Sequence, residues 1–275
     1  MQVRRFAAAS AAMLSLCAGT TLAQDWGVIS TVGDPDPVTG FDLADPIGSQ
    51  VSLGFVDGNF NRGMDFDSPN SFYYYVSTDI LNDPGDRGLW RFDNGVNTQL
   101  FEAPFEDSGD GDASLSADGS TFYVSVDDDD GIGGDSLYAF TNLNGTPSFT
   151  EIGETGLSQL IGIAVHPTTG VLYGYDSDTE ALYTISTADG SATLVGASNE
   201  DLAAIGGMDF NADGSTLLLA DNGTELFTVD INTGALTSAG DPGLNISALS
   251  FRVPTPGTVS LALGATLIAA RRRRG

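Results

Sequence analysis

Short runs of aliphatic and aromatic residues recur from about residue 26 to residue 252, separated by polar turns rich in Asp, Asn, Thr and Gly. Runs of this length between turn residues are typical of β-strands. Asp-Gly and Thr-Gly pairs, as in Ala188-Asp189-Gly190 and Asn232-Thr233-Gly234, favour the tight turns of hairpins. The pattern predicts an all-β fold for this part of the chain.

A unit of four short strands repeats within this region. Each unit begins with a small apolar strand, turns into a strand of aromatic and aliphatic residues, and ends with two further strands. When one apolar residue near the end of each first strand is taken as equivalent, the spacings are 49, 50, 45 and 41 residues. A period in the forties with four strands per unit is the sequence pattern of propeller blades. The equivalent residues are Phe66, Leu115, Val165, Phe210 and Phe251.

The two ends of the repeat region complete one further unit. Trp26–Gly54 fits the last three strands of a unit, and Ser247–Phe251 fits a lone first strand. Joining them ties both ends of the region into one ring and removes exposed sheet edges. We therefore expect a five-bladed β-propeller with one-plus-three strand closure over residues 24–252, with an open sandwich or another blade count as the alternative. The strands expected in Trp26–Gly54 are Gly27–Ile29, Gly40–Leu43 and Gln50–Leu53.

The first 23 residues have the composition of a secretory signal. Two arginines precede an apolar stretch, Phe6–Ala18, which is followed by small residues. We expect a signal helix that is cleaved between Ala23 and Gln24. A buried N-terminal helix is the alternative. Because Cys17 is the only cysteine, the mature protein would contain no thiol and no disulfide.

Residues 253–275 form three modules that follow one another: a Pro-x-Pro pair, a 13-residue apolar run from Thr258 to Ala270, and four arginines. The prolines keep the backbone extended and accessible. As a hydrophobic helix the run would be about 20 Å long, which is short against a hydrocarbon core of about 30 Å. The arginines would hold its end in the cytoplasm. The residues concerned are Pro254, Thr255, Pro256, Arg271, Arg272, Arg273 and Arg274.

This tail resembles the PEP-CTERM sorting signal of exported bacterial proteins. The resemblance covers about the last 23 residues and departs from the family in Thr255, where Glu is usual. It implies recognition at the Pro-x-Pro site by an exosortase-type membrane enzyme, transient anchoring in the inner membrane, removal of the tail, and release or attachment at the cell surface or in an extracellular polysaccharide matrix. A plain C-terminal membrane anchor is the alternative.

Charge excludes one class of partner and suggests another. The chain has 37 Asp and Glu against 10 basic residues, and six of the ten basic residues lie at the extreme ends. Such an acidic domain repels phosphate backbones, so nucleic-acid binding is excluded. Most acids fall in the loops between second and third strands and between units, which would place them on one face of a propeller.

Clustered carboxylates with nearby glycines suit the many oxygen ligands of Ca²⁺, although the EF-hand spacing is absent. A calcium site on the acidic face is one hypothesis, and a solvated surface that keeps an exported protein soluble is the other. The candidate ligands are Asp107, Asp110, Asp112, Asp127, Asp128, Asp129, Asp130 and Asp135.

Catalytic motifs are absent from the sequence. His166 is the only histidine, and its place before Pro167-Thr168-Thr169-Gly170 favours a role in a turn. No Gly-x-Ser-x-Gly elbow or His-Glu-x-x-His helix occurs. We expect a non-catalytic propeller outside the cell that binds polysaccharide or surface proteins. A carbohydrate-acting hydrolase with a carboxylate pair from two blades and a passive spacer are the alternatives.

Overall fold

The structure is a computed structural model that describes residues 26–30, 36–56, 61–68, 70–76, 87–103, 111–126, 134–202, 205–221 and 223–251. The predicted signal with its cleavage position Ala23–Gln24 lies outside these residues. The predicted sorting tail, with Pro254, Thr255, Pro256 and Arg271 to Arg274, also lies outside them. Both predicted terminal helices are therefore outside the described residues. Within the described residues, no helix is long and apolar enough to cross a membrane.

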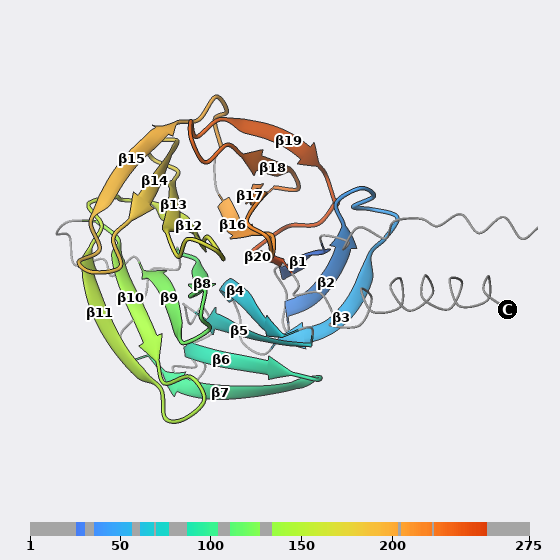
Figure 1. Ribbon diagram of the computed structural model, residues 1–275. Coiled ribbons are helices and arrows are strands. Elements are labelled where there is room, and N and C mark those ends of the chain that lie inside the picture. Colours follow the sequence, from blue (N-terminus) through green and yellow to red (C-terminus); the bar gives the residue numbers. More distant parts are fainter. Residues whose placement is uncertain are drawn as a thin grey trace, which may run out of the picture.

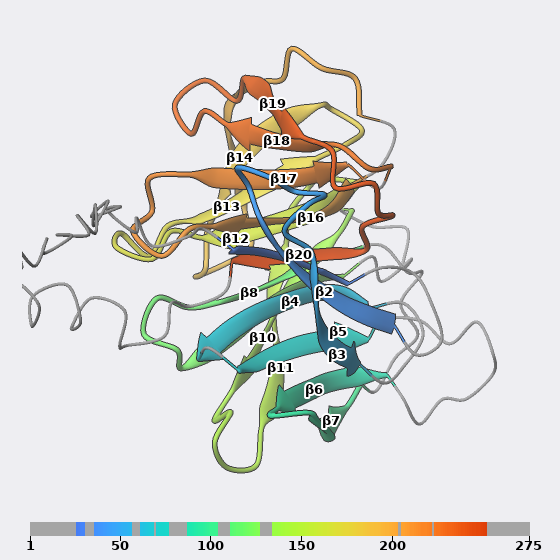
Figure 2. The same ribbon diagram turned by 90° about the vertical axis from the view of Figure 1, so that its right-hand side faces the viewer.

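The described strands pair into five antiparallel four-stranded sheets that stand around a central axis (Figure 1). Turned by 90°, the ring shows its strands running between two opposite faces (Figure 2). This arrangement confirms the prediction of an all-β propeller. In each sheet the first strand of the repeat lies nearest the axis and the fourth lies at the rim (Figure 1).

The sheets follow the repeat order. The first contains β1 (Trp26–Ser30), β2 (Asp36–Asp42) and β3 (Val51–Val56), and the second contains β4 (Asn61–Ser68), β5 (Ser71–Val76), β6 (Gly88–Asp93) and β7 (Val96–Glu102). The third contains β8 (Ala113–Leu115), β9 (Thr121–Val126), β10 (Ser136–Thr141) and β11 (Ser148–Glu154). The fourth contains β12 (Leu160–Val165), β13 (Leu172–Asp176), β14 (Ala181–Ile185) and β15 (Ala192–Ala197). The fifth contains β16 (Ile205–Phe210), β17 (Leu217–Asp221), β18 (Leu226–Val229) and β19 (Leu236–Gly240).

The last strand, β20 (Ala248–Phe251), joins the first sheet and pairs with β1, with Ser250 opposite Val28. It also contacts the inner strands β16 and β4, which closes the ring. The sequence predicted Gly40–Leu43 as the third strand of this unit, which corresponds to β2. The predicted start is wrong, because β2 begins at Asp36. Asp36 and Pro37 had the composition of a turn, yet they pair with β3.

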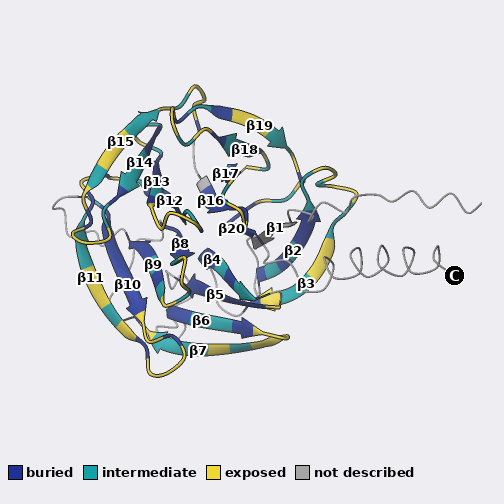
Figure 3. Cartoon of the chain, in the orientation of Figure 1, coloured by how far each residue is buried: buried dark blue, intermediate teal, exposed yellow. Residues whose placement is uncertain are grey.

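Apolar side chains from neighbouring sheets form the core. Along β5 the residues alternate between the two neighbouring sheets: Phe72 and Tyr74 pack toward the first sheet, whereas Tyr73 and Tyr75 pack toward the third. Five such clusters fill the spaces between the sheets. Burial is deepest near the axis, and among the strands the outermost ones carry most of the exposed positions (Figure 3). The aromatic residues of these strands therefore serve packing between sheets.

A bulge recurs between the third and fourth strand of every sheet. At Gly153 and Gly196, within two of these bulges, an added Cβ would collide with the carbonyl oxygens of Asp189 and Thr233, in the outer turn of the following sheet. Glycine is required at these positions because it lets neighbouring sheets approach each other at the rim.

Three aspartates connect the inner strands, which do not pair with one another. Asp65 Oδ2 accepts a hydrogen bond from the Leu115 amide (2.7 Å), and Asp209 Oδ2 accepts one from the Phe251 amide (2.7 Å). Asp112 Oδ2 accepts bonds from two further sheets, namely from the amides of Ile163 (2.9 Å) and Met208 (3.0 Å). These carboxylates, which we call the aspartate clasps (Asp65, Asp112 and Asp209), satisfy N–H groups that no strand partner reaches.

Replacing Asp112 with Ala should lower the free energy of unfolding by about 2–4 kcal/mol, because buried N–H groups from three inner strands would lose their acceptor. Asp112→Asn should cost less, since the amide oxygen still accepts. Asp201→Ala, at an exposed position, serves as the matched control and should change stability little. Urea denaturation at one fixed pH measures all three, and an Asp112→Ala protein as stable as the wild type would rule out a holding role for this clasp.

Candidate functional site

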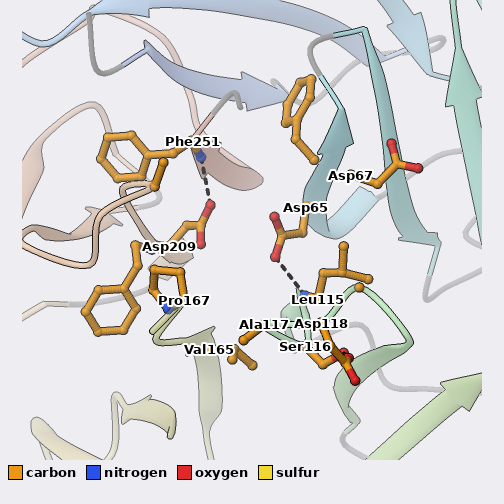
Figure 4. Close-up of a pocket in the computed structure, with 14 residues that line it drawn as sticks. Asp65, Asp67, Leu115, Ser116, Ala117, Asp118, Val165, Pro167, Asp209 and Phe251 are labelled. Carbon is orange, nitrogen blue, oxygen red and sulfur yellow. Dashed lines mark hydrogen bonds between the residues drawn. The ribbon is translucent and has the colours of Figure 1, made fainter. Parts of the chain in front are cut away.

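The five residues that the repeat alignment treats as equivalent meet at one end of the central axis. Phe66, Leu115, Val165, Phe210 and Phe251 come from the ends of the five inner strands and line a pocket of about 420 Å³ (Figure 4). The turns that follow these strands form its rim. The pocket therefore opens on the face of the tight turns, which we call the pocket face, and not on the face of the longer loops.

Four carboxylates line this apolar pocket: Asp65, Asp67, Asp118 and Asp209. Asp65 and Asp209 belong to the inner strands β4 and β16 and point toward each other across it (Figure 4). Asp209 is buried and Asp65 is half-buried. Each lies in the tetrapeptide Gly-Met-Asp-Phe, which occurs in both strands.

The hydroxyl of Ser250 lies between the two facing carboxylates. Its Oγ donates to Asp209 Oδ2 (2.8 Å) and also lies 3.4 Å from Asp65 Oδ1. Because a hydroxyl has one proton, it can donate to only one of the carboxylates at a time. The other oxygens accept amides: Asp65 Oδ2 from Leu115, and Asp209 Oδ1 from Phe210 (2.7 Å).

Both facing carboxyls hold their protons more tightly than usual. Burial raises the pKa of Asp65 from 3.8 to about 6, partly offset by the hydrogen bonds from Leu115, Ser114 and Ser250. Burial, together with the charge of Asp65, raises the pKa of Asp209 well above its ordinary value. Two like charges in one enclosed site disfavour each other, so the pair titrates as a unit.

The third clasp belongs to the same electrostatic group. Burial raises the pKa of Asp112 well above its ordinary value, and the charge of Asp65 adds to the effect. Asp112 does not line the pocket, and its Oδ1 accepts the amide of Ala113 (2.8 Å). Ser114 connects the group further, since its Oγ accepts the amide of Val165 (3.0 Å) and donates to Asp65.

The rim of the pocket carries two further carboxylates, Asp118 and Asp67. Hydrogen bonds from Ser120 and Ser116 lower the pKa of Asp118 to about 2. Asp67 forms an ion pair with Arg91 (2.8 Å), whose guanidinium lies 5.3 Å from the ring centre of Tyr73. Asp118 keeps its negative charge at neutral pH, so the pocket entrance disfavours anions.

The predicted calcium ligands are only partly described. Asp112 is a clasp, and Asp135 is buried, with Oδ2 accepting the amide of Leu160. Asp107, Asp110 and Asp127 to Asp130 lie outside the described residues. Among the residues that the structure describes, no group of three or more His, Asp or Glu side chains is arranged to hold a metal ion. The calcium site stays a prediction.

His166 lies in the turn after β12, as its sequence context suggested. Its Nδ1 accepts the amides of Thr168 (3.2 Å) and Thr169 (3.3 Å), and its ring centre lies 4.9 Å from that of Phe210. These contacts fix the turn that carries Pro167 to the pocket rim.

Sequence reasoning did not select Asp65 and Asp209 as site residues. The sequence nevertheless contained a pattern that could have found them. The same tetrapeptide places an acid inside an otherwise apolar first strand at Gly63–Phe66 and again at Gly207–Phe210. A charged residue in a strand that lies at the axis of a propeller needs a partner or a function.

Comparison with known proteins supports the fold. A family described as "Domain of unknown function (DUF4394)" matches residues 136–237. The solved structure titled "Crystal structure of Nidogen/Laminin Complex" is similar with a TM-score of 0.56 and 13% identity, over 84% of this chain and 99% of that one. A structural genomics protein of unknown function from Bacteroides thetaiotaomicron matches with a TM-score of 0.45 and 13% identity, over 76% of this chain and 57% of that one. None of the curated proteins matches the sequence.

Asp65→Asn should stabilise the protein near neutral pH. The pKa of Asp65 is about 6 in the folded state against an ordinary 3.8, so the stabilisation from its bound proton is complete below about pH 4 and is lost as the pH rises through 6. Asparagine does not titrate, and its amide oxygen can still accept the Leu115 amide. The unfolding free energy of the variant minus that of the wild type should rise by about 1–3 kcal/mol from pH 4 to pH 7 in urea denaturation.

Asp118→Asn is the control of opposite sign. The pKa of Asp118 is lowered, so its charged form stabilises the folded state above the ordinary pKa, and this contribution is lost as the pH falls. The variant should therefore lose stability relative to the wild type as the pH rises. If the effect of Asp65→Asn did not change with pH, the elevated pKa of Asp65 would be disproved.

Proposed function

We propose that this protein is an exported, non-catalytic β-propeller. It binds a small molecule, or a sugar unit of a larger glycan, in the pocket at the ends of the five inner strands. The observation that carries the proposal is the convergence of all five inner strands on one apolar pocket of about 420 Å³ with a facing carboxyl pair. Ligand sites are typically concave, mostly apolar, and supplied with a few fixed polar groups whose pKa values are shifted.

The chemistry of the lining selects the class of ligand. Its side-chain polar groups are mainly carboxylates, which accept hydrogen bonds when ionised. A fitting ligand therefore supplies donors, such as hydroxyl or ammonium groups, and has an apolar face to set against Phe66, Phe210 and Phe251. Neutral and amino sugars meet both conditions, whereas acidic sugars would be repelled by Asp118.

A carbohydrate-acting hydrolase is the second candidate, because Asp65 and Asp209 form a carboxyl pair with raised pKa values. The hydrogen bonds favour binding over catalysis. Both oxygens of Asp209 accept backbone amides, so this member of the pair already holds strands together, whereas in Asp65 it is Oδ2 that accepts the amide of Leu115. A catalytic acid or nucleophile needs an oxygen that is free to reach the substrate.

Export and sorting are part of the proposal and rest on the sequence. The signal-like segment up to Ala23 and the Pro-Thr-Pro tail support delivery to the cell surface, the outer envelope or an extracellular matrix, with an exosortase-type enzyme as the processing partner. The apolar run Thr258–Ala270 would anchor the chain in the inner membrane before that step.

Blocking the pocket should abolish ligand binding. We expect neutral or amino oligosaccharides to bind saturably in calorimetric titration, and uronate-containing ones not to bind. Ala212→Trp places a large side chain at an exposed rim position and should weaken binding at least tenfold, which corresponds to about 1.4 kcal/mol. The matched control, Ala188→Trp, alters an exposed alanine in another tight turn outside the pocket lining and should bind as the wild type does.

The same samples distinguish the two functions. If the wild type released new reducing ends from the oligosaccharides, and if this activity were lost in Asp65→Asn but kept in Asp118→Asn, the hydrolase would be favoured. Equal binding by wild type and Ala212→Trp, or no saturable binding of any oligosaccharide, would contradict the pocket as the binding site.

Removing the apolar run and the arginines should change the location of the protein. In a bacterium with an exosortase-type enzyme, deletion of residues 258–275 should release the protein as a soluble exported form, because nothing retains it in the bilayer. Pro254→Ala combined with Pro256→Ala should leave it uncleaved and bound to the membrane. Immunoblots of cell fractions measure both, and an unaltered distribution of the deletion variant would overturn the sorting role.

A further inference from the structure

Both ends of the described chain lie on the pocket face. Phe251, the last residue of β20, lines the pocket itself. Gly27 is its register partner in β1, so the start of β1 lies at the same end of the sheet. The segments before Trp26 and after Phe251 therefore leave the propeller from one face.

The exit point lies near the centre of that face. The order of the first sheet is β20-β1-β2-β3, with β20 innermost (Figure 1). With strands spaced at about 4.8 Å, the outermost strand β3 lies about 14 Å from β20. A chain that leaves at Phe251 must first cross this distance before it reaches the rim.

The connection to the apolar run is too short to reach the other face. Arg252 to Gly257 separate Phe251 from Thr258, and the seven Cα–Cα steps between these two residues span at most about 25 Å. A route from Phe251 over the rim and up the side of the ring is longer than about 30 Å, because a six-residue strand such as β12 adds about 20 Å of height. The direct route along the axis is crossed by the side chain of Asp112, which accepts the amides of Ile163 and Met208 and so joins three inner strands.

We infer that, while Thr258–Ala270 is anchored in a bilayer, the propeller is held with its pocket face toward the lipid headgroups and its loop face toward the outside. The inference rests on the membrane anchoring in the proposed function. In this orientation the pocket lies next to the bilayer surface. The opposite face, which carries the longer loops, is the one that large partners can reach.

The charges of the pocket face indicate that it faces the lipid without docking on it. The pKa values of Asp118, Asp189, Asp213 and Asp230, all in tight turns of this face, are lowered by hydrogen bonds from neighbouring Ser, Thr and Asn residues and from backbone amides. These carboxylates stay ionised and are repelled by phosphate headgroups at short range. The connection from Phe251 to Thr258 sets the upper limit of the gap, about 25 Å.

A gap of this size restricts what reaches the pocket. A single glycan chain is thin enough to enter between the face and the bilayer, whereas a folded protein is not. Removal of the tail would lift this restriction, so processing would change the accessibility of the pocket as well as the location of the protein.

Cysteine labelling in vesicles tests the orientation. The full chain with Cys17→Ser is reconstituted into phosphatidylglycerol vesicles. One cysteine is introduced at exposed Ala212 on the pocket face or at exposed Ser158 in the loop before β12, on the opposite face. A maleimide carrying a bulky poly(ethylene glycol) chain should label Ala212→Cys several-fold more slowly than Ser158→Cys. A small maleimide should label both at similar rates, which controls for folding and local exposure.

A linker variant tests the cause. Inserting about 30 Gly and Ser residues after Gly257 lets the domain turn over, so bulky labelling at Ala212→Cys should rise to the level of Ser158→Cys. Equal bulky labelling of the two positions in the original, vesicle-bound chain would overturn the orientation and leave the anchoring intact. Failure of the chain to sediment with vesicles would overturn the anchoring and the orientation together.

Discussion

The inner strands of this propeller cannot satisfy their own inward-facing amides, and the ring depends on how that constraint is met. Each inner strand pairs with only one neighbour in its sheet, which leaves one row of backbone groups directed toward the axis. Asp65, Asp112 and Asp209 accept amides from four of the inner strands other than their own. A carboxylate suits this task because it accepts several bonds at once and does not need a strand partner.

The same solution creates the candidate site. Carboxylates placed at the axis are desolvated and close to one another, so their pKa values rise. Where the inner strands end, two of these groups face a pocket whose walls are apolar because the repeat places an apolar residue at that position in every unit. Asp65 and Asp209 thus belong both to the aspartate clasps and to the lining of the candidate site, and changes that weaken the clasps are expected to affect the pocket.

Much of this architecture is legible in the sequence, and the reason is periodicity. The equivalence of Phe66, Leu115, Val165, Phe210 and Phe251, derived from spacing alone, places one residue per unit at the pocket. Individual strand limits were harder to predict, as at Asp36 and Pro37, where turn-forming residues are overruled by pairing with β3. The facing pair could not be predicted by pattern, because Asp65 and Asp209 are 144 positions apart and only ring closure through β20 brings Ser250 between them.

The closure strand also determines how the molecule would bear mechanical load. Tension on the C-terminal segment acts on Phe251 and runs along the axis of β20, while the hydrogen bonds from β20 to β1 lie perpendicular to it. All bonds of the pair are then loaded together in shear, rather than opened one after another as in unzipping. A propeller pulled through this strand therefore resists the load at the point where its chain is closed.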